Sequence, residues 1–197
     1  MGREASGVVD LAPRDDESHG ARIYPWGMPV RLARPSDLRH LAAIEDAGVP
    51  MFEEYLGDAM VPVLASPAPA GVDRQLSGTL LVAADAGEVV GFAHLTFPDG
   101  YAHLDQLSVL PAHGRRGIGA ALVRAVMEEA RWAGHDRLSL TTYRDVPWNG
   151  PFYARLGFVE KHPLEPFQER QRAHERELGL DDAGVRTVME VALDGGR

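Results

Sequence analysis

The sequence predicts a mixed α/β fold in which one central sheet is flanked by helices. Short apolar runs typical of strands recur along the chain, and two of them meet at a hairpin signal, Asp85-Ala86-Gly87-Glu88. A long segment with apolar residues at helical spacing, 118–130, lies between two further runs. Because 197 residues can enclose one substantial core, we expect a single domain.

The N-terminal third divides into an arm and the start of the domain. Residues 1–28 mix Asp, Glu, Arg, Gly and Pro with little periodicity, which predicts a flexible N-terminal arm followed by a domain over 29–197. Residues 30–33 alternate like a strand. The sequence at 35–37 then opens a helix whose apolar side continues to Phe52.

The central part of the chain supplies most of the predicted sheet. Residues 61–78 contain three prolines and no firm period, so we expect a short helix and a loop. Strands are predicted at 80–84, 89–95 and 104–110. The helix over 118–130, which Gly134 ends, should pack on them.

The remaining elements follow from shorter signals. Pro151 suits the first turn of a short helix, with Asn149 or Gly150 as its cap. Few apolar residues occur between 168 and 178, so a helix there should lie on the surface. The other expected elements are strands at 138–143, 158–160 and 186–193.

Composition excludes several classes of function. The net charge of -9 argues against nucleic acid as a partner. The chain has no cysteine, so disulfides, cysteine-based metal sites and a cysteine acyl intermediate are excluded. No apolar segment reaches membrane-spanning length and no signal-peptide pattern begins the chain, so we expect a cytoplasmic protein without membrane partners. Lys161 is the single lysine, an arginine bias typical of a GC-rich bacterial genome.

A glycine-rich turn links the strand at 104–110 to the long helix. Glycines let a backbone approach a ligand closely, and the free N–H groups at a helix start favour an anion. The turn is therefore a candidate phosphate cradle, although such turns also serve only as connections. Its spacing, Gly-x-x-Gly-x-Gly, differs from that of a dinucleotide-binding turn. Its residues are Gly114, Arg115, Arg116, Gly117, Ile118 and Gly119.

Together, the strand 107–109, the turn 115–119 and the Asn149, Tyr153, Gly157-Phe158 pattern resemble the GNAT superfamily of N-acetyltransferases. The family usually has Gln or Arg where this chain has Gly114, which leaves the backbone donors in place. The resemblance covers 29–193. It implies a GNAT-like, mixed, mostly antiparallel central sheet with a splayed strand pair, flanked by helices.

The resemblance also implies acetyl-CoA as the co-substrate. The turn, from Gly114 to Gly119, would hold the diphosphate. The strand edge would pair with the pantetheine amides through the backbone of Leu107, Ser108 and Val109. Asn149 is either a donor to the coenzyme or a helix cap.

Three side chains are candidates for the chemistry. The resemblance places Tyr153 near the thioester sulfur, where its hydroxyl would protonate the departing thiolate. His103 occupies the position of a glutamate base in histone-acetylating members, and Asp105 would either take the proton or bind the charge of the acceptor. A structural role stays open for all three. Glu53 and Glu54 are weaker candidates for contacts with the acceptor.

The predicted function is acetyl transfer from acetyl-CoA to a primary amine by direct attack. A module of the same fold that binds acyl-CoA as a sensor, without turnover, is the alternative, and Tyr153 favours the enzyme. The acceptor could be an antibiotic, a polyamine, an amino acid or a protein N-terminus. Homodimer formation also stays open.

Overall fold

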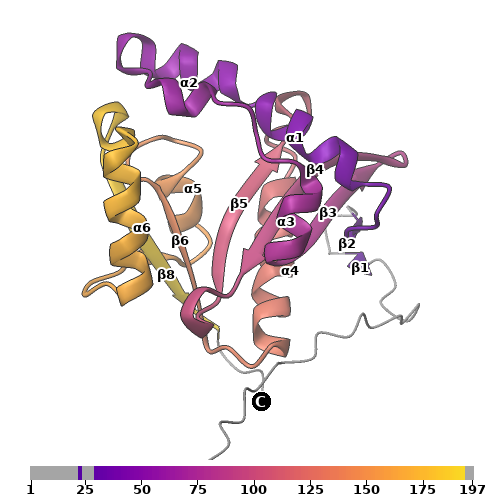
Figure 1. Ribbon diagram of the computed structural model, residues 1–197. Coiled ribbons are helices and arrows are strands. Elements are labelled where there is room, and N and C mark those ends of the chain that lie inside the picture. The colour runs from indigo at the N-terminus through magenta and orange to yellow at the C-terminus, as the bar shows by residue number, and fades with distance from the viewer. Residues whose placement is uncertain (1–21, 24–28, 194–197) are drawn as a thin grey trace, which may run out of the picture.

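The computed structural model describes residues 22–23 and 29–193, and its centre is one eight-stranded sheet (Figure 1). The predicted arm, 1–28, lies outside the described residues except for two residues that form the first strand. The strands follow the spatial order β1-β2-β3-β4-β5-β6-β8-β7. Their bounds are β1 Arg22–Ile23, β2 Pro29–Leu32, β3 Thr79–Asp85, β4 Glu88–Thr96, β5 His103–Val109, β6 Arg137–Tyr143, β7 Val159–Glu160 and β8 Arg186–Ala192.

The sheet is mostly antiparallel, as predicted, and its one parallel pair among the described strands is β5 with β6. That pair is short, because only His103 with Ser139 and Leu104 with Leu140 are in register. Beyond Leu104 the two strands separate, and Figure 1 shows them diverging toward the end of the sheet where α2 lies. The predicted splayed strand pair is confirmed.

One face of the sheet is covered by α4 (Ile118–Trp132) and α5 (Gly150–Ala154). Eight residues of α4 are buried, including Leu122 and Val126, which are fully enclosed. They pack on apolar side chains that alternate along β3, β4 and β5, such as Leu95 and Leu104. The helical spacing in the sequence therefore marks the main core.

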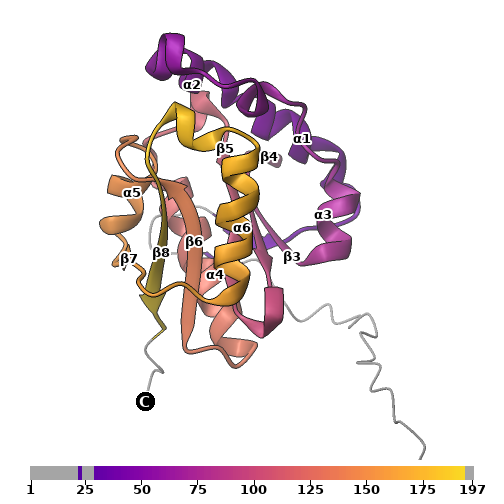
Figure 2. The same cartoon turned by 60° about the vertical axis from the view of Figure 1, so that its left-hand side comes forward.

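The other face carries α1 (Leu38–Asp46), α3 (Gly71–Ser77) and α6 (Pro166–Glu177) (Figure 2). Leu41 and Ile44 of α1 pack on Leu80, Val82 and Phe92. Figures 1 and 2 show α1 and α3 on the side of β3 and β4, and α6 on the side of β6 and β8, where its Glu175 pairs with Arg186. No helix among the described residues is long and apolar enough to cross a membrane.

Two predictions about helices were wrong in part. The helix expected to continue to Phe52 is two helices, α1 and α2 (Val49–Leu56), because Pro50 has no N–H with which to continue the first one. The helix near 168–178 is α6, and it is not confined to the surface. Arg172 and Glu175 are buried beneath it, where Arg172 also pairs with Asp181 at 2.6 Å. The buried side of α6 is thus held partly by ion pairs, so the helix lacks the apolar stripe from which burial is predicted in a sequence.

Candidate active site

The free edge of β5 begins where its pairing with β6 ends. Leu107, Ser108 and Val109 pair with β4 on one side, and β6 does not pair with them on the other. Their backbone N–H and C=O groups on that side lack a strand partner, which is what an added strand-like ligand needs. The structure thus provides the edge that the sequence predicted.

The glycine-rich turn leads directly from β5 into the N-terminus of α4. Arg115 and Gly117 both have positive φ, 57° and 80°, a conformation that is uncommon for a residue with a side chain. A Cβ built on Gly117 would have no described heavy atom within 4 Å, so it would point into open space before the helix. The start of a 15-residue helix favours an anion in this space.

The other turn residues have more local roles. A Cβ on Gly114 would lie 3.1 Å from the carbonyl oxygen of Pro111, and one on Gly119 would lie 3.4 Å from the ring of Phe152. Ile118 is buried in the main core and fixes the first turn of α4. These three residues therefore shape the turn through packing as well as through their backbone.

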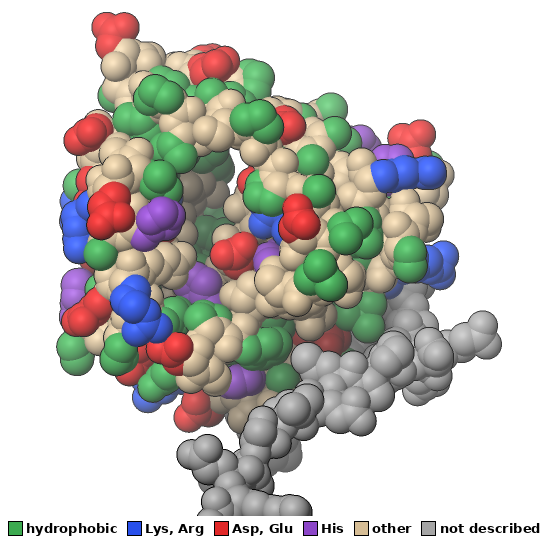
Figure 3. Space-filling view, in the orientation of Figure 1, with side chains coloured by type: hydrophobic (Ala, Val, Ile, Leu, Met, Phe, Trp, Pro, Cys, Tyr) green, Lys and Arg blue, Asp and Glu red, His purple; other side chains and the backbone are tan. Residues whose placement is uncertain are grey.

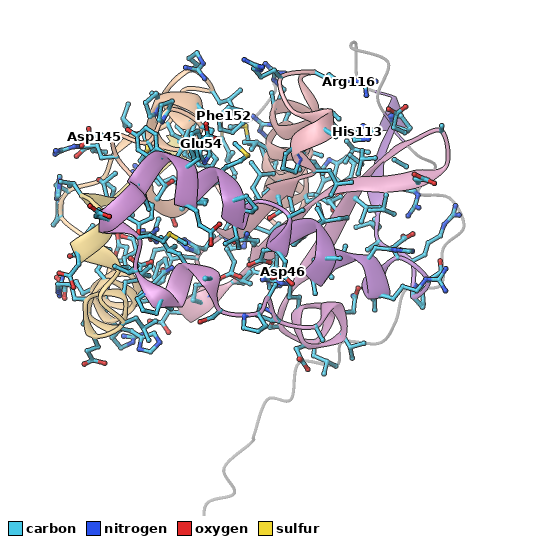
Figure 4. The ribbon with its side chains drawn as sticks, turned by 90° about the horizontal axis from the view of Figure 1, so that it is seen from above. Asp46, Glu54, His113, Arg116, Asp145 and Phe152 are labelled. Carbon is cyan, nitrogen blue, oxygen red and sulfur yellow. The ribbon has the colours of Figure 1, made fainter. Side chains whose placement is uncertain are left out.

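Arg116 is already paired in this state of the protein. Its guanidinium donates to Asp85 Oδ2 at 2.9 Å and lies 3.1 Å from His113 Nδ1. Figure 4 shows Arg116 and His113 side by side at one end of the molecule, with Phe152 and Glu54 nearer its centre. The side chain is half-exposed, so its guanidinium could donate to a phosphate either together with Asp85 or in place of Asp85.

Tyr153 lies on α5 within the main core, in edge-to-face contact with Phe152 and Phe158. Burial raises the pKa of its phenol above the ordinary value of 10, and no hydrogen bond contributes to that shift. The phenol therefore stays protonated at physiological pH, as a general acid must, although the raised pKa makes transfer to a thiolate less favourable.

Asn149 directly precedes α5, where the sequence left two roles open. It occupies the cap position but makes no side-chain capping hydrogen bond. Its amide is therefore not used to cap α5 and remains a candidate donor to the coenzyme.

Asp105 is the extra residue of a β-bulge in β5. His94 of β4 faces Gln106 and Leu95 faces Leu104, so Asp105 has no partner on β4. Bulges redirect side chains and are common near active sites. The Asp105 carboxylate accepts from His94 Nδ1 at 3.0 Å and lies 3.5 Å from Arg74 Nη1.

His103 shares that face of the sheet but is buried, with its ring against Phe167 of α6. Burial lowers the pKa of His103 from 6.5 to about 4, although the charges of Asp105 and Glu175 act in the opposite direction. The imidazole is therefore neutral at pH 7. This environment makes it a weak base in the free protein, and its predicted catalytic role stays untested.

Ser139 is the hydrogen-bond partner of His103. Its hydroxyl lies 2.9 Å from His103 Nδ1 and 3.3 Å from the carbonyl oxygen of Ala102. The other ring nitrogen of His103, Nε2, is buried and has no partner among the described residues.

Helix α2 lies above the splayed strands as a roof (Figure 1). Phe52 and Tyr55 contact Trp148 of the β6–α5 connection, at ring-centroid distances of 5.6 and 5.3 Å. Glu53 and Glu54 are on the exposed part of this helix. Figure 3 shows the face of the molecule hollowed beneath the roof, with acidic and histidine side chains along the hollow.

The free strand edge, the turn at a helix N-terminus and the hollow beside them together form one candidate site. A family model described as "Acetyltransferase (GNAT) family" matches residues 41–158, well over half of the 197-residue chain. The chain belongs to the GNAT acetyltransferase family.

Two curated relatives are mycothiol acetyltransferases. That of Amycolatopsis mediterranei is 49% identical over 55 residues, which are 27% of this chain and 18% of the relative. That of Mycobacteroides abscessus is 36% identical over 102 residues, which are 47% of this chain and 33% of the relative. The chain thus matches no more than a third of the length of either protein.

Solved structures share the fold. The PaiA N-acetyltransferase from Thermoplasma acidophilum, in complex with coenzyme A, has a TM-score of 0.59 at 17% identity, over 84% of this chain and 98% of that one. N-acetylglutamate synthase from Neisseria gonorrhoeae, complexed with coenzyme A and N-acetyl-glutamate, has a TM-score of 0.61 at 19% identity, over 85% and 35%. The predicted GNAT fold is confirmed, and coenzyme A in these relatives supports the prediction of acetyl-CoA as co-substrate.

Proposed function

We propose that this protein transfers an acetyl group from acetyl-CoA to a primary amine by direct attack. The observation that carries the proposal is the free edge of β5, which runs from beyond Leu104 to the glycine-rich turn. Strand, turn and helix N-terminus follow one another in the chain. They match the order of an extended ligand with amides at one end and a diphosphate at the other.

The donor would lie along β5 with its diphosphate at the turn. Backbone groups of Leu107 and Val109 would pair with the pantetheine amides, and the N–H groups from Gly117 to Gly119 would face the diphosphate. The open space before Gly117 agrees with this placement. The amide of Asn149, which makes no capping hydrogen bond, would contact the donor.

The chemical step begins when the acceptor ammonium loses a proton to water or to His103. The amine nitrogen then forms a bond to the thioester carbonyl carbon, the C–S bond breaks, and the nitrogen, which is positively charged once bonded, releases its second proton to solvent. Tyr153 donates its proton to the departing thiolate and regains one from solvent. The products are an N-acetyl amine, the free thiol of CoA and one released proton. A cysteine acyl intermediate is excluded, since the chain has none.

The alternative function, an acyl-CoA sensor without turnover, needs the same donor site. Tyr153 favours the enzyme, because a binding module does not need a proton donor at the sulfur. The names of the curated relatives also favour transfer, although the similarity covers only part of each of them.

A screen for release of the CoA thiol would test the proposal. Acetyl-CoA is offered with a polyamine, an aminoglycoside, free amino acids and a peptide with a free N-terminus, and its binding is measured separately from the rise in melting temperature. We expect binding, and turnover with at least one amine. Binding without turnover across all classes would identify the sensor, and a protein that does not bind acetyl-CoA would refute both functions.

A further inference from the structure

The part of the site that the chemistry above leaves unused is a polar cluster behind Asp105. Arg74 of α3 donates to Glu45 Oε2 of α1 at 2.5 Å through Nη2, and its Nη1 lies 3.5 Å from Asp105 Oδ2. His94 of β4 holds the same carboxylate oxygen at 3.0 Å. Arg74 and His94, from two different elements, therefore meet at the Asp105 carboxylate, and Glu45 of a third element holds Arg74.

Burial within this cluster is uneven. The side chains of Arg74 and His94 are 8% and 3% exposed, whereas that of Asp105 is 42% exposed. Two buried groups thus hold a carboxylate that faces outward at the start of the splay. A carboxylate that served only to neutralise Arg74 would gain nothing from this exposure, since ion pairs weaken as solvent reaches them.

The cluster contains two carboxylates, those of Glu45 and Asp105, beside the single guanidinium of Arg74. Burial by itself would raise the pKa of Asp105. The hydrogen bond from His94 and the guanidinium of Arg74 act in the opposite direction, and this pKa lies below its ordinary value. Asp105 is therefore an anion at neutral pH and a poor proton acceptor.

A second observation nearby is a set of buried polar atoms without partners. Nε2 of His103, on the same face, and Nε of Arg74 are buried without a partner in the described part of the chain. The hydroxyl of Thr141, two residues after Ser139 on the opposite strand, is also buried and unpartnered among the described residues. Buried polar atoms without a partner are rare in folded proteins and are usually met by water or a ligand.

We infer that Asp105 binds the ammonium group of the acceptor, and that Arg74 and His94 are positioning residues that hold its carboxylate toward the hollow. This inference rests on the proposed function and deepens it. The acceptor is then a compact primary amine that carries no anionic group near its ammonium. An ammonium offers three N–H donors, and the exposed Asp105 carboxylate can accept from it.

Binding of 2-aminoethanol to the CoA-saturated protein tests the inference, with backbone amide NMR shifts along β5 as the readout. We expect a saturable shift with the wild type and none with ethylene glycol, which keeps a similar size but has no charge. Asp105→Asn should weaken the affinity at least tenfold. Asp73→Asn is the matched control, because it removes the same charge from an exposed position next to Arg74 and should change nothing.

The positioning roles need their own variants. His94→Leu and Arg74→Gln should each weaken binding of 2-aminoethanol, whereas His94→Asn should restore most of it, because the Asn amide can replace the Nδ1 donor. A merely structural His94 would not show this rescue. Equal affinity in wild type and His94→Leu would overturn the positioning role.

Two results would overturn the ammonium site itself. They are a wild type without a saturable shift, and an Asp105→Asn variant that binds 2-aminoethanol as tightly as the wild type. Binding of CoA is followed by calorimetry in the same samples. A protein that binds CoA but not 2-aminoethanol refutes the ammonium site alone, and one that does not bind CoA refutes the proposed function.

Discussion

Gly117 offers the sharpest test of the donor site, because strain and ligand contact can be separated there. Its φ of 80° penalises any residue with a side chain, and an added Cβ would meet no described atom within 4 Å. Gly117→Ala should therefore cost about 1 to 2 kcal/mol of stability from strain alone. For a protein of this size, each kcal/mol lowers the melting temperature by roughly 2 to 4 °C.

Gly134 provides the matched control at the other end of the same helix. Its φ is 89°, and a Cβ there would also find open space. Gly134→Ala should lose similar stability without acetyl-CoA, but it lies far from the anion-binding end of α4. A difference between the two variants in the shift that acetyl-CoA causes in melting temperature then reports ligand binding and not backbone strain.

The difference appears when acetyl-CoA is added and melting temperatures are measured. At a concentration a hundredfold above Kd, the ligand should stabilise the wild type and Gly134→Ala by about 2.7 kcal/mol. If the Cβ of Gly117→Ala weakens binding a hundredfold, the same concentration stabilises that variant by only about 0.4 kcal/mol. Equal ligand-induced shifts in the two variants would show that the diphosphate does not bind at this turn.

Three further predictions follow from the same structure. Tyr153→Phe should lower kcat about a hundredfold or more with acetyl-CoA affinity nearly unchanged, and a wild-type rate across the pH range would make this tyrosine structural. Deletion of residues 1–27 also removes β1, which pairs with β2 through only two residues, so thermal stability and acetyl-CoA binding should stay close to wild type. A large loss of either would show that this segment contributes more than this short pairing. Because burial lowers the pKa of His103 from 6.5 to about 4, the unfolded chain takes up this proton first as pH falls. The contribution of His103 to the free energy of unfolding is fully present above pH 6.5 and decreases by about 3 kcal/mol as the pH falls toward 4. Chemical unfolding should show this slope, and His103→Asn should flatten it.

The strand, turn and helix of the proposed donor side could be predicted from the sequence because their determinants are local. The strand, the turn and the helix follow one another within 104–130, so the glycine spacing and the apolar periodicity are enough to predict their order. The short helix with Tyr153 is equally local, since Pro151 marks its start.

The cluster around Asp105 could not be found in this way. Glu45, Arg74, His94 and Asp105 come from four elements, and each looks ordinary in its own segment. His94 stands in an apolar strand, where a single histidine is more often a structural group. Their convergence depends on the bulge that inserts Asp105, and the register of β4 with β5 is a property of the folded sheet. The break between α1 and α2 has a local signal in Pro50, which the continuous apolar side obscured.

The splay places the proposed donor and acceptor groups on opposite faces of one sheet. Tyr153 belongs to the core on the α4 face, whereas Asp105 contacts Arg74 of α3 and His94 of β4 on the other face. A continuous sheet would separate these groups by a layer of paired backbone. Because β5 and β6 pair only through Leu104, the sheet is open just beyond it, and a thioester lying along β5 would be reached from both sides. An amine bound at Asp105 would then approach the carbonyl carbon from one face while Tyr153 protonates the sulfur from the other. The short parallel pairing of β5 and β6 is thus the feature on which both proposals depend.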